Sequence, residues 1–149
     1  GIASVVGMET PETDWDVDAE LDLLQQRWRD HTDEDFYYVH VKKTDSAGED
    51  GDFDKKVHLL EEMDARIPRI LELEPDVLIV TGDHSTPSIM RAHSWHPVPT
   101  VIVSGHSIPV QGSQLSERSC ATGSLGQIPS TALMALALAH AGRLAKFGA

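Results

Sequence analysis

The amino-acid sequence predicts an α/β fold with a mostly parallel sheet and helices on both of its faces. The short, uniformly apolar segment at residues 77–80 is typical of a buried strand, because it has no polar, solvent-facing side. Residues 100–103 (TVIV), which follow Pro97 and Pro99, are expected to form another strand. A third short segment, at residues 36–41, is rich in the aromatic and β-branched residues that favour strands. Segments with helical periodicity alternate with these strands, and this alternation predicts parallel strands covered by helices.

The chain opens abruptly in strand-like residues, 1–8, without an initiator methionine, which leads us to expect a fragment or a processed product. A helix follows from Thr13 or Asp14, since either side chain can cap a helix. Its apolar residues recur at steps of three and four as far as Trp28, which predicts one buried helix face. The strand at residues 36–41 comes next.

A polar segment, residues 42–54, follows that strand. Apolar residues at helical spacing begin again at Val57, and Pro68 is expected to kink or split this second helix because proline lacks a backbone donor. Pro75 ends the helix, and the strand at residues 77–80 follows directly.

The last part of the chain begins with the strand at residues 100–103. Residues 105–127 are rich in glycine and serine without a clear period, so we expect a loop or lid there. The strongest helical segment runs from Ser130, as its cap, to Lys146, and Gly148 should stop it.

Composition limits the classes of function. The chain of 149 residues carries 12 Lys and Arg against 24 Asp and Glu, and a net charge of −12 argues against a nucleic-acid partner. With 40% hydrophobic residues, we expect one domain spanning residues 1–149. The single Cys120 fits a reducing compartment, which favours a cytoplasmic location. No apolar run approaches the roughly 20 residues that span a bilayer, so no membrane partner is expected.

Polar side chains follow the predicted strands where ligands bind in open α/β sheets. Asp45 and Glu49 lie beyond the first strand, and Asp83 and His84 lie beyond the second. A further group that starts at His93 precedes the third strand and can fold over the same edge. Clustered carboxylates and imidazoles are typical ligands of Mn²⁺, Zn²⁺ or Mg²⁺. The sequence therefore predicts a site for divalent cations.

Three ordered motifs carry a family resemblance. Residues 40–52 read HVKKTDSAGEDGD, residues 81–87 read TGDHSTP, and residues 93–99 read HSWHPVP. In this order they resemble the signatures of archaeal-type, cofactor-independent phosphoglycerate mutases of the alkaline phosphatase superfamily. The resemblance runs nearly from end to end of the chain.

The resemblance implies an alkaline-phosphatase-like fold and an enzyme that interconverts 2- and 3-phosphoglycerate through a phosphoserine intermediate. Two divalent ions, Mn²⁺ or Mg²⁺ before Zn²⁺, would stabilise the attacking and leaving oxygens. By the same resemblance, one ion is bound by Asp83 and His84, the other by Asp45, Glu49 and His93, and Lys42 faces the substrate phosphate.

Two departures from the family pattern bear on activity. The family has histidine at the position of Glu49, and a charged oxygen ligand should favour Mg²⁺ or Mn²⁺ over Zn²⁺. The family's serine nucleophile and a further metal-binding aspartate lie in an amino-terminal stretch that this chain lacks. Residues 1–149 are therefore expected to be the carboxy-terminal part of the metal-binding domain, without a catalytic residue of their own and inactive alone.

Two alternative functions remain open at this stage. Other phosphomutases and hydrolases of the same superfamily share the Asp-His metal chemistry, although the motif around Lys42 favours the mutase. A degenerate, non-catalytic metal-binding domain is the second alternative, and Glu49 is the residue that supports it.

Overall fold

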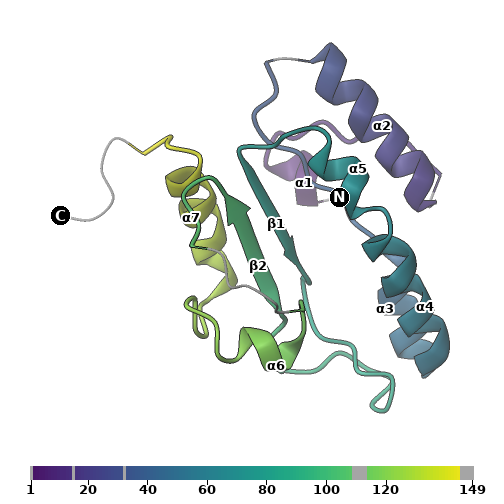
Figure 1. Ribbon diagram of the computed structural model, residues 1–149. Coiled ribbons are helices and arrows are strands. Elements are labelled where there is room, and N and C mark those ends of the chain that lie inside the picture. Colours follow the sequence, from purple (N-terminus) through teal and green to yellow (C-terminus); the bar gives the residue numbers. More distant parts are fainter. Residues whose placement is uncertain (1, 15, 32, 109–113, 145–149) are drawn as a thin grey trace.

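The computed structural model of the chain describes residues 2–14, 16–31, 33–108 and 114–144 (Figure 1). Two strands and several helices make up this part of the chain. None of these helices is both long and apolar enough to cross a bilayer. The strands are β1 (Val77–Thr81) and β2 (Thr100–Ser104), and the helical elements are α1 (Ile2–Val5), α2 (Val17–Asp30), α3 (Lys43–Asp50), α4 (Phe53–Asp64), α5 (Ile67–Leu71), α6 (Glu117–Cys120), η1 (Ser130–Ala132) and α7 (Leu133–His140).

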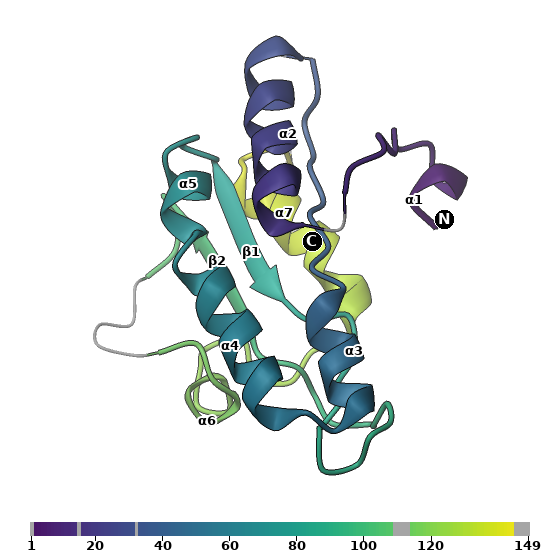
Figure 2. The same ribbon diagram turned by 90° about the vertical axis from the view of Figure 1, so that its right-hand side faces the viewer.

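The two strands pair antiparallel, with Val77 opposite Ser104 and Thr81 opposite Thr100. The expectation of parallel strands is wrong for this pair. A parallel pair needs a crossover connection, usually a helix, whereas residues 82–99 form a loop that returns directly to the edge of β1. Helix α7 lies on one side of the strands, and α4 and α5 lie on the other, so the prediction of helices on both faces is confirmed (Figures 1 and 2).

Residues 36–41 do not form the predicted strand, and Phe36 and Tyr38 are exposed. A strand requires a hydrogen-bonded neighbour, and in the described residues β1 and β2 pair only with each other. The strand-like opening of the chain is likewise not extended, because residues 2–5 form the short helix α1.

Helix α2 begins at Val17, later than predicted, because Asp16 and not Thr13 or Asp14 caps it. The Asp16 carboxylate accepts hydrogen bonds from the backbone N–H groups of Asp18 and Ala19. The predicted apolar face is confirmed, since Leu21 and Leu24 are buried. On the polar side, Arg66 and Arg69 both contact Asp18 and tie α5 to α2.

Pro68 divides the second helical segment as predicted, since α4 ends at Asp64 and α5 carries Pro68 in its first turn. Helix α3 occupies part of the polar segment at residues 42–54, for which no helix was predicted. At the far end of the chain, Ser130 starts a 3₁₀ turn and α7 already ends at His140. Gly142 adopts a left-handed backbone there (φ 67°), and the predicted helix end at Lys146 lies outside the described residues.

The predicted buried strands are only partly buried in this chain. Residues 77–80 and 100–102 are all of intermediate exposure, and Val103 is 47% exposed. A sheet of two strands leaves both outer edges open, so it cannot enclose its own side chains. The hydrophobic side chains that are buried in the described residues are Leu21, Leu24 and Ala47.

Candidate metal centre

Helix α3 places Asp45 and Glu49 one turn apart on the same face. The Asp45 side chain is only 12% exposed, whereas Glu49 is about half exposed. The helix ends at Gly51, whose left-handed backbone (φ 74°) lets its N–H bond the carbonyls of Ala47 and Gly48. One carboxylate therefore sits deep in the site and the other at its rim.

The loop after β1 supplies the second set of side chains. Asp83 accepts a hydrogen bond from the backbone N–H of His84 through Oδ1, at 3.0 Å. A single antiparallel bridge between Ser85 and Ser94 then draws the outgoing and returning parts of this loop together. This bridge brings His93 beside His84, with their ring centroids 3.9 Å apart.

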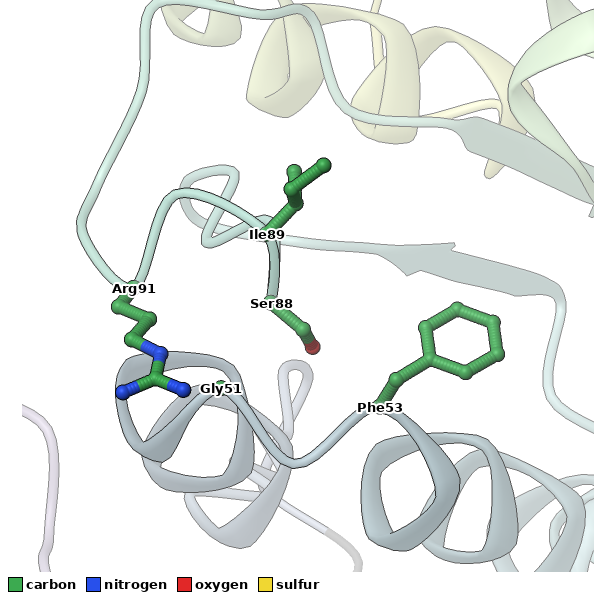
Figure 3. Close-up of a pocket in the computed structure, with 5 residues that line it drawn as sticks. All are labelled: Gly51, Phe53, Ser88, Ile89 and Arg91. Carbon is green, nitrogen blue, oxygen red and sulfur yellow. The ribbon is translucent and has the colours of Figure 1, made fainter.

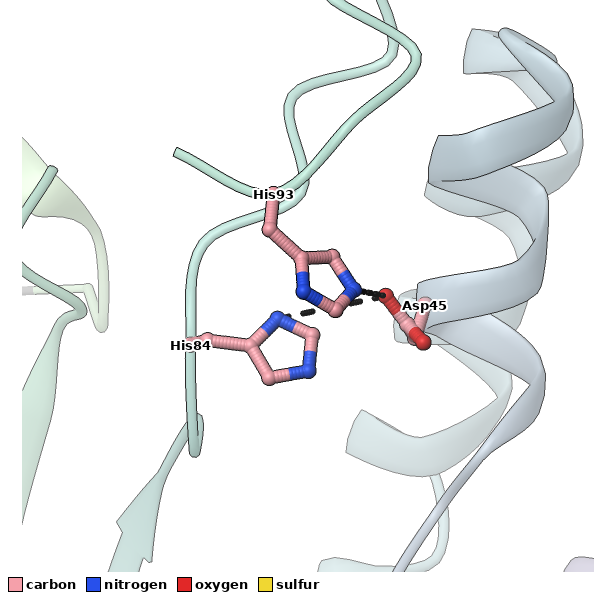
Figure 4. A group of neighbouring side chains, drawn as sticks. All are labelled: Asp45, His84 and His93. Atoms are coloured by element: carbon pink, nitrogen blue, oxygen red, sulfur yellow. Dashed lines mark ion pairs between the residues drawn. The ribbon is translucent and has the colours of Figure 1, made fainter. Parts of the chain in front are cut away.

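His93 links the loop to α3. Its Nε2 atom lies 3.5 Å from Oδ1 of Asp45 (Figure 4). The same atom lies 3.6 Å from Oε1 of Glu49. Donor atoms bound about 2.1 Å from one ion lie about 3–3.5 Å from each other. Each carboxylate is thus spaced from His93 as a second ligand of the same cation would be.

A second group forms around Asp83. Its Oδ2 atom lies 3.6 Å from Nε2 of His84 and 3.9 Å from Nε2 of His40. His40 was not among the predicted ligands, although its place two residues before Lys42 in the first motif was a signal for it. The two groups are neighbours, because ligand atoms of Asp45, His84 and His93 all lie within 4.8 Å of one another.

Hydrogen bonds keep Asp45 ionised. The Lys42 ammonium donates to Oδ2 at 2.7 Å and the Thr86 hydroxyl donates to Oδ1 at 2.7 Å. These contacts lower the pKa of Asp45 from 3.8 to about 2, and the carboxylate in turn raises the pKa of Lys42. An ionised carboxylate is the form that binds cations. The structure pairs Lys42 with Asp45, while its predicted contact with a phosphate stays a prediction.

The pocket in Figure 3 lies apart from the predicted ligands. It has a volume of about 410 Å³ and is lined by Gly51, Phe53, Ser88, Ile89 and Arg91. The Arg91 side chain packs against Gly51, where an added Cβ would lie 2.3 Å from Nε of the arginine. Because none of the predicted site residues lines this pocket, it adds nothing to the cluster of carboxylates and imidazoles.

Carboxylates and imidazoles gathered beside the end of a strand are typical of metal-binding sites in α/β proteins. The chain belongs to the Metalloenzyme superfamily, whose profile matches residues 7–140. This result confirms the alkaline-phosphatase-like class that the motifs indicated.

Relatives of the chain are longer than the chain itself. It is 54% identical over 149 residues to a "Probable 2,3-bisphosphoglycerate-independent phosphoglycerate mutase" of Thermotoga neapolitana, which covers all of this chain and 36% of the relative. A protein of the same name from Thermus thermophilus is 47% identical over 152 residues, again covering the whole chain and 37% of the relative. The chain therefore spans about a third of the length of these curated relatives.

A solved structure shares the fold. The match to "Structure of PH0037 protein from Pyrococcus horikoshii" has a TM-score of 0.88 and 30% sequence identity, and it covers 99% of this chain and 47% of that one. The likeness extends over α1 to α7, so the arrangement that positions the candidate centre recurs in a protein of known structure.

Proposed function

We propose that this chain is the carboxy-terminal, metal-binding part of a 2,3-bisphosphoglycerate-independent phosphoglycerate mutase. The parent protein would be an isomerase that interconverts 2- and 3-phosphoglycerate. One observation carries the proposal: two ligand groups, one around His93 and one around Asp83, lie side by side in a chain whose relatives bear the mutase name. Two adjacent cation sites are what an in-line phosphoryl transfer requires.

The residues fit two divalent ions. Asp45, Glu49 and His93 would hold one ion, and Asp83 and His84 would hold the other, with His40 near enough to join the second group. Such ions would stabilise charge on the attacking and leaving oxygens of the transferring phosphoryl group. Three carboxylates in the set favour Mn²⁺ or Mg²⁺, and the imidazoles also allow Zn²⁺.

Lys42 would bind the phosphate group of the substrate. Its Nζ atom is 2.7 Å from Asp45 and its side chain is about half exposed, so it stands at the rim of the first ion group. An ammonium group in that place neutralises an arriving phosphoglycerate without occupying a cation position. The substrate is the proposed small-molecule partner, and a cytoplasmic location is proposed on the same grounds together with the single free Cys120.

The exposed surface supports the view that residues 1–149 are part of a larger domain. A compact protein of 16.3 kDa exposes about 7,500 Å², whereas this chain exposes 10913 Å². The difference is of the size that extensive, permanent interfaces bury. The remainder of the parent protein would cover the open strand edges, extend the sheet into a mostly parallel one, and supply the serine nucleophile.

An assay of the full-length parent protein tests the function. With Mn²⁺ bound, we expect interconversion of 2- and 3-phosphoglycerate and only slow release of inorganic phosphate. Removal of the metal by a chelator should abolish turnover, and re-addition should restore it. Phosphate release without isomerisation would instead identify a hydrolase of the same superfamily.

A second function is a metal-binding domain without catalysis, and Glu49 is the observation that favours it. This glutamate stands where the mutase motif has histidine, yet its Oε1 atom is 3.6 Å from Nε2 of His93. The full-length protein with Glu49→His separates the two functions. A degenerate protein would gain no turnover from this single change, while a mutase would change its turnover and metal preference together.

A further inference from the structure

Thr86 joins the two ligand groups. It is the buried polar residue of the described chain, with 4% of its surface exposed. Its hydroxyl oxygen lies 2.7 Å from Oδ1 of Asp45 and 3.1 Å from Nδ1 of His84. One side chain outside the proposed ligand set therefore contacts one ligand from each group.

The hydroxyl has a single proton, and this fixes the direction of both hydrogen bonds. An ionised carboxylate only accepts, so the Thr86 proton goes to Asp45. The hydroxyl oxygen can then only accept from His84, which requires a proton on Nδ1. In a neutral imidazole the lone pair is then left on Nε2, the atom that lies 3.6 Å from Asp83.

We propose that Thr86 is a positioning residue that holds His84 in its Nδ1–H tautomer, aims Nε2 at the ion beside Asp83, and orients Asp45 for the other ion. The inference rests on the proposed metal site and adds a residue to it. The hydrogen bond opposite a ligating nitrogen sets which nitrogen binds the ion, and its loss commonly lowers metal affinity.

The other tautomer of His84, with its lone pair on Nδ1, would bind the other ion. The hydrogen bond to Thr86 therefore determines which ion His84 binds. Nδ1 of His84 lies 4.0 Å from Oδ1 of Asp45, so a lone pair on Nδ1 would place this histidine in the His93 group. The Asp83 group would then lose its nearest imidazole. Because Thr86 occupies Nδ1, it keeps His84 in the Asp83 group and the two cation positions separate.

Two contacts hold Thr86 in place. The Lys56 ammonium of α4 donates to its carbonyl oxygen at 2.6 Å. Gly48 of α3 lets the same carbonyl approach the helix, since an added Cβ there would lie 2.4 Å from it. The threonine is thus fixed from both helices before any ion binds.

The test uses the full-length parent protein. In the metal-free protein labelled with ¹⁵N-histidine, at a pH where the imidazoles are neutral, the ring ¹⁵N shifts report the tautomer of His84, assigned with His84→Gln. We expect the proton on Nδ1. Thr86→Val, which keeps the shape and removes the hydroxyl, should abolish this preference and weaken Mn²⁺ binding by about 10–100-fold.

Thr86→Ser should keep both the tautomer and the affinity, and Thr122→Val, a distant matched change on an exposed threonine, should alter neither. A proton on Nε2 of His84 in the wild-type protein would overturn the inference, as would unchanged Mn²⁺ affinities in a folded Thr86→Val protein. If that variant does not fold, the inference is still tested by the tautomer of His84 in the wild-type protein and by the tautomer and Mn²⁺ affinity of Thr86→Ser. Absence of any Mn²⁺ binding by the wild-type protein counts against the proposed function instead.

Discussion

The Oε1 atom of Glu49 lies 3.6 Å from the Nε2 atom of His93. Glu49 lies in the last turn of α3 and His93 lies in the loop that leads to β2. The two residues are distant in the sequence and meet only in the folded chain. The same histidine nitrogen is 3.5 Å from Asp45, one helical turn earlier. Glu49 therefore lies within reach of the proposed ion beside His93.

Glu49→His in the full-length protein is expected to shift metal preference. Imidazole suits Zn²⁺ better than a carboxylate does, so the affinity for Zn²⁺ relative to Mg²⁺ should rise about tenfold or more. Competition titrations with the two ions measure this ratio. Glu49→Gln is the control, because it removes the charge without adding an imidazole and should weaken the binding of both ions with little change in their ratio. An unchanged ratio in Glu49→His would remove Glu49 from the ligand set.

Asp45→Asn should weaken Mn²⁺ binding by more than about tenfold, because the variant loses the ionised carboxylate. Lys42 contacts this group at Oδ2, and Thr86 and His93 contact it at Oδ1. Asp50→Asn on the same helix is the matched control, since Asp50 is exposed and outside both ligand groups. Isothermal titration of the full-length protein provides the affinities. Equal affinities for the two variants would show that Asp45 is not a ligand.

Part of the fold follows from local pattern. Residues 77–80 and 100–103 were predicted as strands because both are short segments rich in β-branched apolar residues, and Pro68 was predicted to divide a helix because it lacks a donor. Whether β1 and β2 pair parallel or antiparallel depends on the path of the loop at 82–99 between them, and no local sequence pattern predicts that path. The segment at 36–41 has strand-forming residues but is not hydrogen-bonded to either strand of the described sheet.

The candidate centre was largely predictable although one supporting element was wrong. Asp45, His84 and His93 were expected to meet at the ends of strands, and they do meet, but Asp45 stands on helix α3. The four-residue spacing of Asp45 and Glu49 was the available signal for that helix. The role of Thr86 was not predictable, because a hydroxyl between two ligands is recognised only from their positions in space.

Gly48→Ala is expected to disturb the centre from outside the ligand set. The new methyl group would lie 2.4 Å from the Thr86 carbonyl and 3.1 Å from Nζ of Lys56, so the loop that carries His84 must move. Overpacking of this kind costs about 1–3 kcal/mol of unfolding free energy. Gly105→Ala is the control, because a Cβ there meets nothing within 4 Å. Gly48→Ala should have a lower unfolding temperature and a weaker Mn²⁺ affinity than Gly105→Ala. Equal values for the two variants would contradict the close contact between Gly48 and the Thr86 carbonyl.

Lys42→Met should raise the pKa of Asp45 from about 2 toward 3.8, because the strongest contact that favours the ionised form is lost. A carboxyl group with a lowered pKa in the folded state contributes stability above pH 3.8, and this contribution disappears as the pH falls toward 2. Wild-type and variant stabilities should therefore differ at neutral pH and converge in acid. Carboxyl NMR titration of the metal-free protein checks the pKa, with Lys55→Met as an exposed control. A pKa that stays at about 2 in Lys42→Met would assign the shift to Thr86 alone.

The isolated chain should differ from the full-length protein in its unfolding. Only Leu21, Leu24 and Ala47 are buried hydrophobic residues among those described, and the exposed surface exceeds that of a compact protein of this mass by about 45%. Such a chain has too small a core for a steep, cooperative transition, and its apolar side chains should bind a dye such as ANS. The remainder of the parent protein, added as a separate chain, should suppress dye binding and sharpen the transition. A steep transition without dye binding by the isolated chain would instead show that residues 1–149 form an independent domain.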